Sequence, residues 1–171
     1  WSAVNRVTTG GKELGPEPGE HWWKHRYDFY FPPHSLMLPE MFGTVETTST
    51  YDKIYNIFKA KQQVITEDFK EWGTDYMAHF SHWFPWGVMV YDRFLIAKPP
   101  QDPQEALQLH TQIWGKAARA SLEHGGVLND HHGIGFKLGW LMEEQYGAAW
   151  PTMQGIKDAL DPAGIMNPGK L

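Results

Sequence analysis

The chain has 171 residues, a formal net charge of −5 and no cysteine, which excludes disulfides, thiolate nucleophiles and sulfur metal sites. It contains no clustered lysine and arginine stretch, so nucleic acid is not expected as a partner. Its apolar runs fall short of the roughly 20 residues that a membrane span needs, so no membrane span is expected either.

The first residues predict a linker. Residues 1–20 are rich in glycine, proline and charge and have no periodicity, which is typical of a loop or linker remnant and not of the start of a folding unit. Residues 21–135 are expected to form the main domain. Residues 136–171 are expected to form C-terminal helices and a tail.

A strand and a helix are predicted next. Alternating apolar and polar positions favour extended structure over residues 38–48. Thr50 is then placed to cap a helix over residues 51–72, where isoleucine and aromatic residues recur every three or four positions and form one buried face. Gly73 is well placed to end this helix.

The following segment predicts two strands and a second long helix. Residues 76–97 are rich in β-prone types, and residues 84–87 are expected to form the turn between two strands. Asp102 is expected to cap a helix that begins with proline and ends near residue 124. A short strand at residues 127–128 follows.

The order of these elements predicts the fold class. Strand, helix, two strands, helix and strand in succession indicate an α+β fold with a mostly antiparallel sheet. Residues 136–146 and 150–160 then predict two short helices, and proline and glycine punctuate the remaining eleven residues.

Two adjacent histidines, His131 and His132, stand in a glycine-rich segment between a predicted strand and a predicted helix. Glycines let a ligand approach the backbone closely, and the start of a helix offers free N–H groups. Imidazoles held there could hydrogen-bond a substrate oxygen or relay a proton near neutral pH. A turn whose two histidines are merely exposed explains the same residues, and the chemistry alone leaves both readings open.

Two motifs together resemble a known family. Residues 125–135 read Gly-Gly-Val-Leu-Asn-Asp-His-His-Gly-Ile-Gly, and residues 159–171 end in Asn-Pro-Gly-Lys-Leu. This combination resembles the C-terminal signature of the FAD-linked oxidases of the vanillyl-alcohol oxidase type. The paired histidines and the Val-Glu-Thr-Thr of residues 45–48 are most similar to the alkyl-dihydroxyacetonephosphate synthase subgroup, whereas the hydroxyacid dehydrogenases carry Glu-His-Gly in place of His-His-Gly.

The resemblance implies a ferredoxin-like cap domain that covers one face of an FAD held by a separate FAD-binding domain of the same parent protein. The final helices and tail would return to that domain. Lys170 matches a lysine that lies against the flavin pyrimidine in related oxidases, where a cation would stabilise negative charge on the reduced ring. Asn167, in the same motif, is also expected to bind the cofactor. The chain alone is therefore expected to be inactive and to bind no FAD.

The resemblance also assigns site residues. Tyr91 falls on the strand where the synthases place a catalytic tyrosine, and it would act there as a general acid or base. A neutral phenol needs a neighbour that stabilises the phenolate, and Arg93 is a candidate because alternate side chains of a strand share one face. Thr44 aligns with a hydroxyl residue near the substrate phosphate of the synthases. The catalytic set expected is Tyr91, His131 and His132.

The chain departs from the family at two places. Asp130 stands where the synthases carry a third histidine, which changes the local charge by one unit and is expected to weaken binding of a phosphorylated substrate. Residues 81–87 keep only one histidine where the hydroxyacid dehydrogenases hold a metal, and His131 replaces their glutamate. No metal site of that kind is expected, and a site of His82, His131 and His132 is the alternative left open.

The leading hypothesis is an FAD-dependent oxidoreductase that oxidises an alcohol, hydroxyacid or phenol-like small molecule by hydride transfer to the flavin. One alternative is a synthase-like flavoenzyme that forms an ether bond without net redox change. A second alternative is a ferredoxin-like module that binds without catalysis. A homodimer and a cytoplasmic location are also expected.

Overall fold

The computed structural model describes residues 14–28 and 41–170, and the chain divides into two units, Trp1–Leu38 and Pro39–Leu171. In the first unit, helix α2 (Glu17–His25) begins inside the segment predicted to be a loop. Acidic residues occupy its first turn and basic residues its last, which complements the helix dipole. Residues 1–13 of the predicted linker and residues 38–40 of the predicted strand lie outside the described residues. The domain boundaries at residues 20 and 135 remain predictions.

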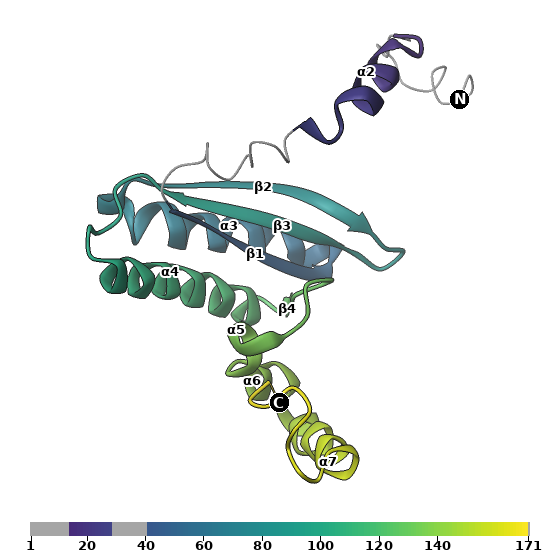
Figure 1. Cartoon of the computed structure of the whole chain (residues 1–171), viewed down its shortest axis with the longest axis vertical. Helices are drawn as coiled ribbons and strands as arrows, with labels where there is room; N and C mark the ends of the chain where they lie inside the picture. Colours follow the sequence, from purple (N-terminus) through teal and green to yellow (C-terminus); the bar gives the residue numbers. More distant parts are fainter. Residues whose placement is uncertain (1–13, 29–40, 171) are drawn as a thin grey trace. The chain divides into compact units, whose positions relative to one another are not determined.

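The second unit contains a four-stranded antiparallel sheet with strand order β2-β3-β1-β4. Helix α3 connects β1 to β2, and helix α4 connects β3 to β4. This is the ferredoxin-like β-α-β-β-α-β arrangement, and it confirms the predicted α+β class. Figure 1 shows both long helices on the same side of the sheet. The elements are β1 (Met41–Thr50), α3 (Tyr51–Glu67), β2 (Thr74–Trp83), β3 (Gly87–Ile96), α4 (Pro103–Glu123) and β4 (Val127–Leu128).

Both long helices begin at the predicted residues, but the first of them ends earlier than predicted. Thr50 precedes α3, as predicted, but its side chain makes no capping hydrogen bond. Helix α3 ends at Glu67 instead of residue 72, and a short 3₁₀ turn, η3 (Lys70–Trp72), follows before Gly73 turns the chain with φ 62°. Asp102 caps α4, since its carboxylate accepts two backbone N–H groups of the first turn at 2.9 and 3.0 Å.

The two faces of the sheet differ in what covers them. Alternate residues of β3 point towards α3 and α4, where Val90, Phe94 and Ile96 are fully buried in the core. The intervening residues Tyr91 and Arg93 lie on the opposite face, which we call the open face. The register places the β1 and β2 residues Thr44, Glu46 and His79 on it as well.

A buried polar network lies on the helix side of the sheet. Lys61 of α3 is fully buried and forms a close ion pair with Asp92 of β3. The Tyr76 hydroxyl donates to the same carboxylate oxygen at 2.8 Å, and Lys61 Nζ donates to Thr47 Oγ1 at 3.1 Å. Burial lowers the pKa of the Lys61 ammonium and raises the pKa of the Asp92 carboxyl. The network therefore joins α3 to the middle of the sheet by charge as well as by apolar packing.

The C-terminal part is helical, and the helix predicted over residues 136–146 is interrupted. Gly139 lies at the interruption, where the tail passes close by, and a Cβ added there would lie 3.4 Å from the Lys170 carbonyl oxygen. None of the helices among the described residues is long and apolar enough to cross a membrane. The elements are α5 (Gly135–Gly139), α6 (Met142–Tyr146), η4 (Gly147–Ala149) and α7 (Trp150–Leu160).

Candidate active site

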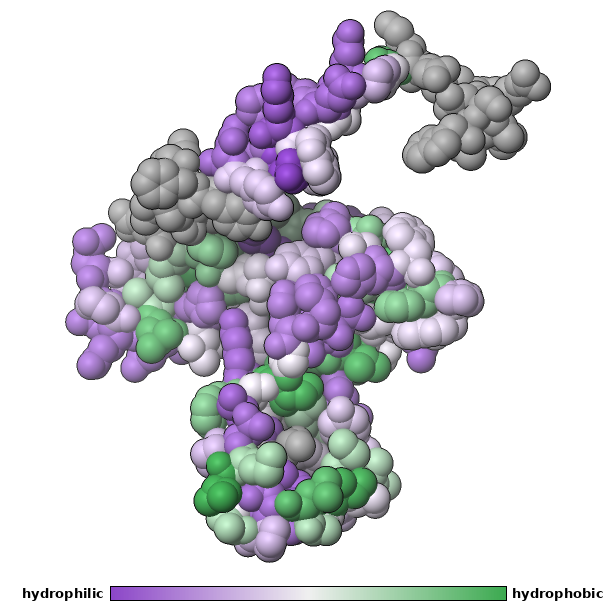
Figure 2. Space-filling view, turned by 45° about the vertical axis from the view of Figure 1, so that its right-hand side comes forward, coloured by the Kyte–Doolittle hydropathy of each residue, from purple (hydrophilic) through white to green (hydrophobic). Residues whose placement is uncertain are grey.

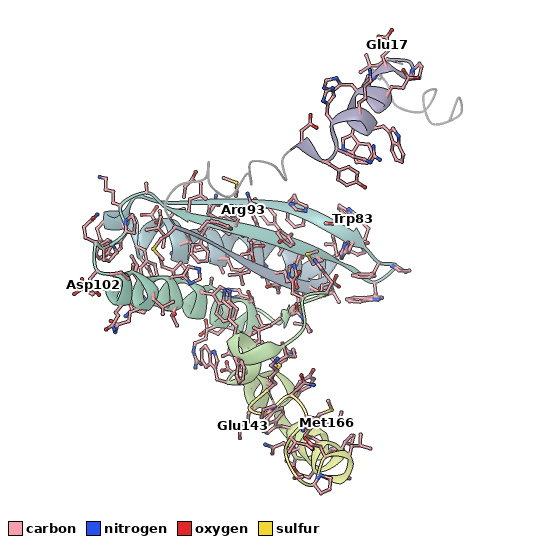
Figure 3. The ribbon with its side chains drawn as sticks, in the orientation of Figure 1. Glu17, Trp83, Arg93, Asp102, Glu143 and Met166 are labelled. Atoms are coloured by element: carbon pink, nitrogen blue, oxygen red, sulfur yellow. The ribbon has the colours of Figure 1, made fainter. Side chains whose placement is uncertain are left out.

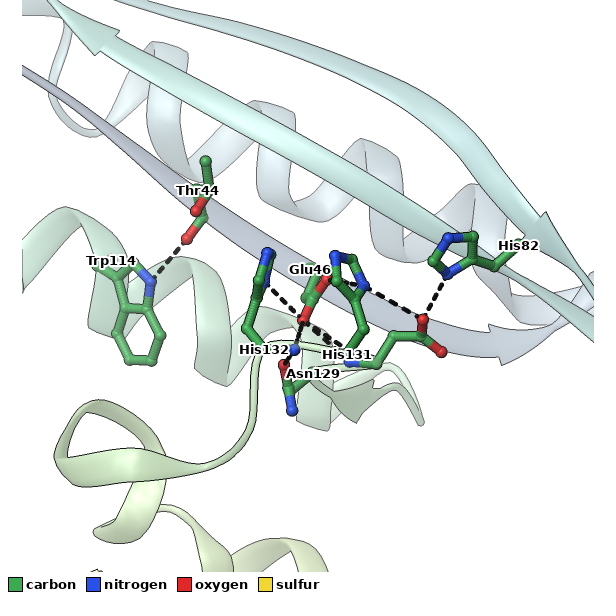
Figure 4. A network of polar contacts seen from close by, with 8 residues as sticks. Thr44, Glu46, His82, Trp114, Asn129, His131 and His132 are labelled. Atoms are coloured by element: carbon green, nitrogen blue, oxygen red, sulfur yellow. Dashed lines mark hydrogen bonds and ion pairs between the residues drawn. The ribbon is translucent and has the colours of Figure 1, made fainter. Parts of the chain in front are cut away.

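The loop after β4 is held against the open face by several hydrogen bonds to one side chain, that of Glu46 of β1. Its Oε1 atom accepts the backbone N–H groups of three successive residues, Asp130, His131 and His132, at 3.0, 3.3 and 3.3 Å. Asn129 begins the loop in a left-handed conformation, with φ 70°, and its N–H donates to the Glu46 carbonyl oxygen at 3.1 Å. Figure 4 shows how these contacts gather the loop around the carboxylate.

The same carboxylate lies beside both imidazoles. His132 Nδ1 is 2.9 Å from Glu46 Oε1, and His131 Nδ1 is 3.1 Å from Glu46 Oε2. The two imidazole centroids are only 4.0 Å apart. The Glu46 side chain is 5% exposed, whereas those of His131 and His132 are 42% and 49% exposed. The glutamate is therefore enclosed by the loop, and the two rings remain open to a ligand.

Asp130 links this loop to the β2–β3 hairpin. Its Oδ2 atom lies 2.5 Å from His82 Nδ1 and 3.3 Å from His131 Nδ1. The hydrogen bond with His82 lowers the pKa of the Asp130 carboxyl, and the bond with His131 lowers it further. His82 itself sits at an irregularity in β2 with φ 49°. The aspartate that replaces the third histidine of the synthases thus ties His82 to the histidine pair.

Tyr91 lies at the centre of the open face. Its ring stacks with His79 of the neighbouring strand, with centroids 5.3 Å apart, and lies 6.0 Å from His131 and 5.7 Å from His132. Among the described residues, the Tyr91 hydroxyl has no hydrogen-bond partner. A hollow of about 280 Å³ lies beside it, lined by Met77, Ala78, His79, Tyr91 and Arg93. The sequence-predicted catalytic set is therefore brought together in space.

The two predicted substrate-binding residues are direct neighbours across β1 and β3, where Thr44 pairs with Arg93. The Arg93 guanidinium lies 5.7 Å from the centroid of the Phe42 ring, and in the described part of the chain it makes no ion pair with a carboxylate. Figure 3 marks Arg93 on the sheet and Trp83 towards the end of the β2–β3 hairpin. The positive charge is thus available on the same face as Tyr91.

A second cavity, of about 180 Å³, borders the site at the edge of β1. Burial lowers the pKa of Lys137, whose ammonium lies 4.5 Å from the centroid of the Trp114 ring. The Trp114 indole N–H donates to the Thr44 carbonyl oxygen at 3.0 Å, as Figure 4 also shows. The cavity is lined by Thr44, Val45, Glu46, Trp114, Leu128, Asn129, His132, Gly133, Ile134, Lys137 and Leu138.

The predicted cofactor residues lie elsewhere, in the C-terminal part. Asn167 is exposed and has φ 48°, and its carbonyl oxygen accepts the Lys170 N–H at 3.3 Å. The Lys170 ammonium lies 5.3 Å from the centroid of the Phe136 ring. Within the described ranges, no contact joins either residue to Tyr91 or to the histidine pair. The structure therefore separates these two residues from the predicted catalytic set.

The backbone of the loop after β4 is open at two of its glycines. Gly133 and Gly135 have positive φ, and no other heavy atom lies within 4 Å of a Cβ built at either position, so a flat ring could approach the loop backbone. In residues 41–170, no glycine-rich loop precedes the long helices α3 and α4, where the pyrophosphate of a dinucleotide would be held.

Two groups of side chains have the composition of metal sites, Glu46 with His131 and His132, and His82 with Asp130 and His131. In the first group the nitrogen–oxygen distances are 2.9 and 3.1 Å, which are ordinary hydrogen-bond lengths. Ligands about 2.1 Å from a tetrahedral ion would lie about 3.4 Å from one another. In the first group the nitrogen and oxygen atoms therefore lie closer together than two ligands of one ion would.

Two residues of this cluster, Glu46 and His79, were not predicted as site residues. Glu46 is the only charged residue of β1, in a stretch of threonine and apolar residues, and that isolation was an available signal. Alternation also puts it on the same face as Thr44. His79 had no comparable signal, because its place beside Tyr91 depends on the register of β2 against β3.

The His82–Asp130 contact makes a pH-dependent prediction. Because the pKa of Asp130 is lowered in the folded chain, the contact adds stability above the ordinary value of 3.8 and loses it as the pH falls through the lowered value. Asp130→Asn should therefore destabilise the chain at pH 7 by less than about 1 kcal/mol, since His82 is largely exposed. Thermal unfolding at pH 7 and pH 3 measures this. The difference should be smaller at pH 3 than at pH 7, and Asp158→Asn on α7 is the control; a difference independent of pH would contradict the prediction.

Comparisons with known proteins place the chain in a family. Residues 16–171 match the model of the FAD linked oxidases, C-terminal domain. The chain is similar to alkyldihydroxyacetonephosphate synthase of Dictyostelium discoideum, with 31% identity over 168 residues, covering 92% of this chain and 26% of the relative. It is also similar to the enzyme of that name in Trypanosoma brucei brucei, with 28% identity over 166 residues, 95% of this chain and 27% of the relative.

A solved structure of alkyldihydroxyacetonephosphate synthase has the same fold, with a TM-score of 0.56 and 22% identity over 94% of this chain and 26% of that one. The chain thus spans about a quarter of the length of these relatives. The resemblance inferred from the two sequence motifs is confirmed, including the subgroup. The chain belongs to the family of FAD-linked oxidase C-terminal domains.

Proposed function

We propose that this chain is the substrate-binding part of an FAD-dependent oxidoreductase, in which the open face supplies the acid, base and orienting groups. The observation that carries the proposal is the convergence of Tyr91 with the imidazoles of His131 and His132, at 5.7 to 6.0 Å between ring centroids. Three groups that can exchange protons thus gather on a face that α3 and α4 leave uncovered, and one of them, Tyr91, lines a hollow there.

In this proposal the substrate is a small alcohol, hydroxyacid or phenol-like molecule bound in the hollow beside Tyr91. The Arg93 guanidinium orients an anionic or carbonyl oxygen of the substrate, and Thr44 adds a hydroxyl opposite it. Tyr91 or one of the two imidazoles takes the hydroxyl proton of the substrate. FAD, when bound, supplies the hydride acceptor.

The C-terminal part is proposed to contact the FAD-binding domain. Asn167 and Lys170 would approach the flavin, with Lys170 stabilising negative charge on the reduced ring. Exposed apolar side chains gather on this part, as Figure 2 shows, and a partner domain would bury them. These are Phe136, Trp140, Ile156, Leu160, Ile165 and Met166. The homodimer and the cytoplasmic location remain predictions.

The second candidate is ether-bond formation without net redox change. It is favoured by the relatives named alkyldihydroxyacetonephosphate synthase, which match 92% and 95% of this chain. Arg93 on the open face, which makes no ion pair with any residue of 14–28 or 41–170, would suit a phosphorylated substrate in that reaction.

Flavin spectroscopy of the parent protein, which joins this chain to an FAD-binding domain, separates the candidates. An oxidoreductase should lose its oxidised-flavin absorbance when an alcohol or hydroxyacid substrate is added without oxygen. A synthase should exchange the acyl chain of an acyl-dihydroxyacetone phosphate for an alkyl chain without net bleaching. The 171-residue chain alone should be colourless. A parent protein that contains no flavin would contradict both candidates and favour a binding module.

A further inference from the structure

We infer that Glu46 is a positioning residue of this site, which holds Nδ1 of His132, and together with Asp130 that of His131, as hydrogen-bond donors and thereby leaves Nε2 of each ring to accept a proton. The inference rests on the proposed function, because it assumes that the histidine pair acts on a substrate. It goes further by naming the group that fixes the pair and the ring atoms that act.

The first step of the argument is the backbone of the loop. Three successive N–H groups, those of Asp130, His131 and His132, converge on Oε1 of Glu46. Converging backbone N–H groups form an anion-binding concavity, and here a carboxylate of the chain itself occupies it. Because Glu46 lies in the middle of β1, paired with Tyr91 of β3, this contact fixes the position of the histidines relative to the tyrosine.

The second step is the environment of the two carboxylate oxygens. Oε1 also lies 2.9 Å from His132 Nδ1. Oε2 is buried and has no hydrogen bond of good geometry in the described part of the chain, yet His131 Nδ1 lies 3.1 Å from it. A buried carboxylate oxygen is costly without a donor, and a small rotation of the His131 ring would supply one. Oε1 is thus assigned to His132, and His131 Nδ1 lies between two acceptors, Glu46 Oε2 at 3.1 Å and Asp130 Oδ2 at 3.3 Å.

The third step is the consequence for the imidazoles. A neutral imidazole has one N–H and one lone pair, and a carboxylate beside Nδ1 selects the form with the proton on Nδ1. The lone pair then resides on Nε2, which is the atom that can take a proton from a substrate. A carboxylate behind a catalytic imidazole has this role in hydrolytic triads, where the isosteric amide leaves the geometry intact but selects the wrong tautomer.

The test reads the tautomers directly. In the ¹⁵N-labelled chain, the ring nitrogens of His131 and His132 should show protonated Nδ1 and unprotonated Nε2 in the neutral form. In Glu46→Gln, whose amide oxygen can still accept the backbone N–H groups, this preference should be lost for His132, whereas His131 Nδ1 keeps Asp130 Oδ2 as an acceptor at 3.3 Å. Asp130→Asn is the matched control, and it should leave the His132 signals unchanged, because in the described part of the chain the Asp130 carboxylate contacts the rings of His82 and His131 but not that of His132.

Activity of the FAD-containing parent protein gives the second measurement. Glu46→Gln should lower kcat by on the order of 10²-fold or more, with a smaller effect on KM, because the tautomer and not the substrate contact changes. Rings that carry the proton on Nε2 in the unaltered chain would overturn the inference, whether or not the variant folds. So would one-to-one binding of Zn²⁺ through the two Nδ1 atoms, since Glu46 would then be a metal ligand. The NMR measurement needs no flavin, so it can succeed or fail independently of the proposed function.

Discussion

Replacing Lys61 with methionine is expected to lower the free energy of unfolding by about 3–5 kcal/mol. The side chain is fully buried, and its ammonium is the ion-pair partner of Asp92. Its removal would leave the Asp92 carboxylate buried with only the Tyr76 hydroxyl as a donor. The Asp92 carboxylate would still bear the desolvation penalty of a buried ion. The attraction of the Lys61 ammonium, which offsets this penalty in the unaltered chain, would be lost.

Chemical denaturation of the chain at pH 7 measures this effect. The double replacement of Lys61 by methionine and Asp92 by leucine should recover much of the loss, because two buried charges are exchanged for apolar groups together. Lys59→Met, two residues earlier on the exposed side of α3, should change the stability by less than about 0.5 kcal/mol. A loss below about 1 kcal/mol for Lys61→Met alone would mean that water reaches the pair and that the core is looser than the structure indicates.

The position of Lys61 in the sequence already indicated that its side chain faces the core. Helix α3 was predicted from Ile54, Ile57 and Ile65, which are buried as expected. Lys61 lies four residues after Ile57 and four before Ile65, so helical periodicity puts it in the middle of the same apolar stripe. A lysine at such a position is ordinarily assumed to reach solvent. Only a partner in the core makes its burial tolerable, and Asp92 is 31 positions away in the sequence.

The sequence predicts which residues of one strand lie on the open face, but not which residues of different strands meet there. Alternation along β3 was enough to put Tyr91 and Arg93 on one face. The pairing of Tyr91 with Glu46 was not predictable, because a shift of one residue between β1 and β3 would turn Glu46 to the core. The contact of His82 with Asp130 spans 48 positions and arises only after the sheet and the β4 loop have formed.

Tyr91→Phe is expected to lower kcat of the flavin-containing parent protein by roughly 10²- to 10⁴-fold, the usual contribution of a general acid or base. The substitution removes only the hydroxyl, which has no hydrogen-bond partner among the described residues. The ring contacts with His79, His131 and His132 would be retained. Steady-state kinetics with the substrate identified by flavin bleaching or chain exchange measures the effect.

The control for this change is Tyr55→Phe, which removes a hydroxyl from an exposed tyrosine of α3, on the helix side of the sheet. It should leave kcat and KM unchanged. Stability separates catalysis from structure, because Tyr91→Phe should leave the free energy of unfolding within about 0.5 kcal/mol of the unaltered chain. If Tyr91→Phe kept full activity, the proton would have to be exchanged by the histidine pair alone. Tyr91 would then serve as the surface against which the His79 and His131 rings stack, and the substrate hydroxyl would be expected at Nε2 of His131 or His132.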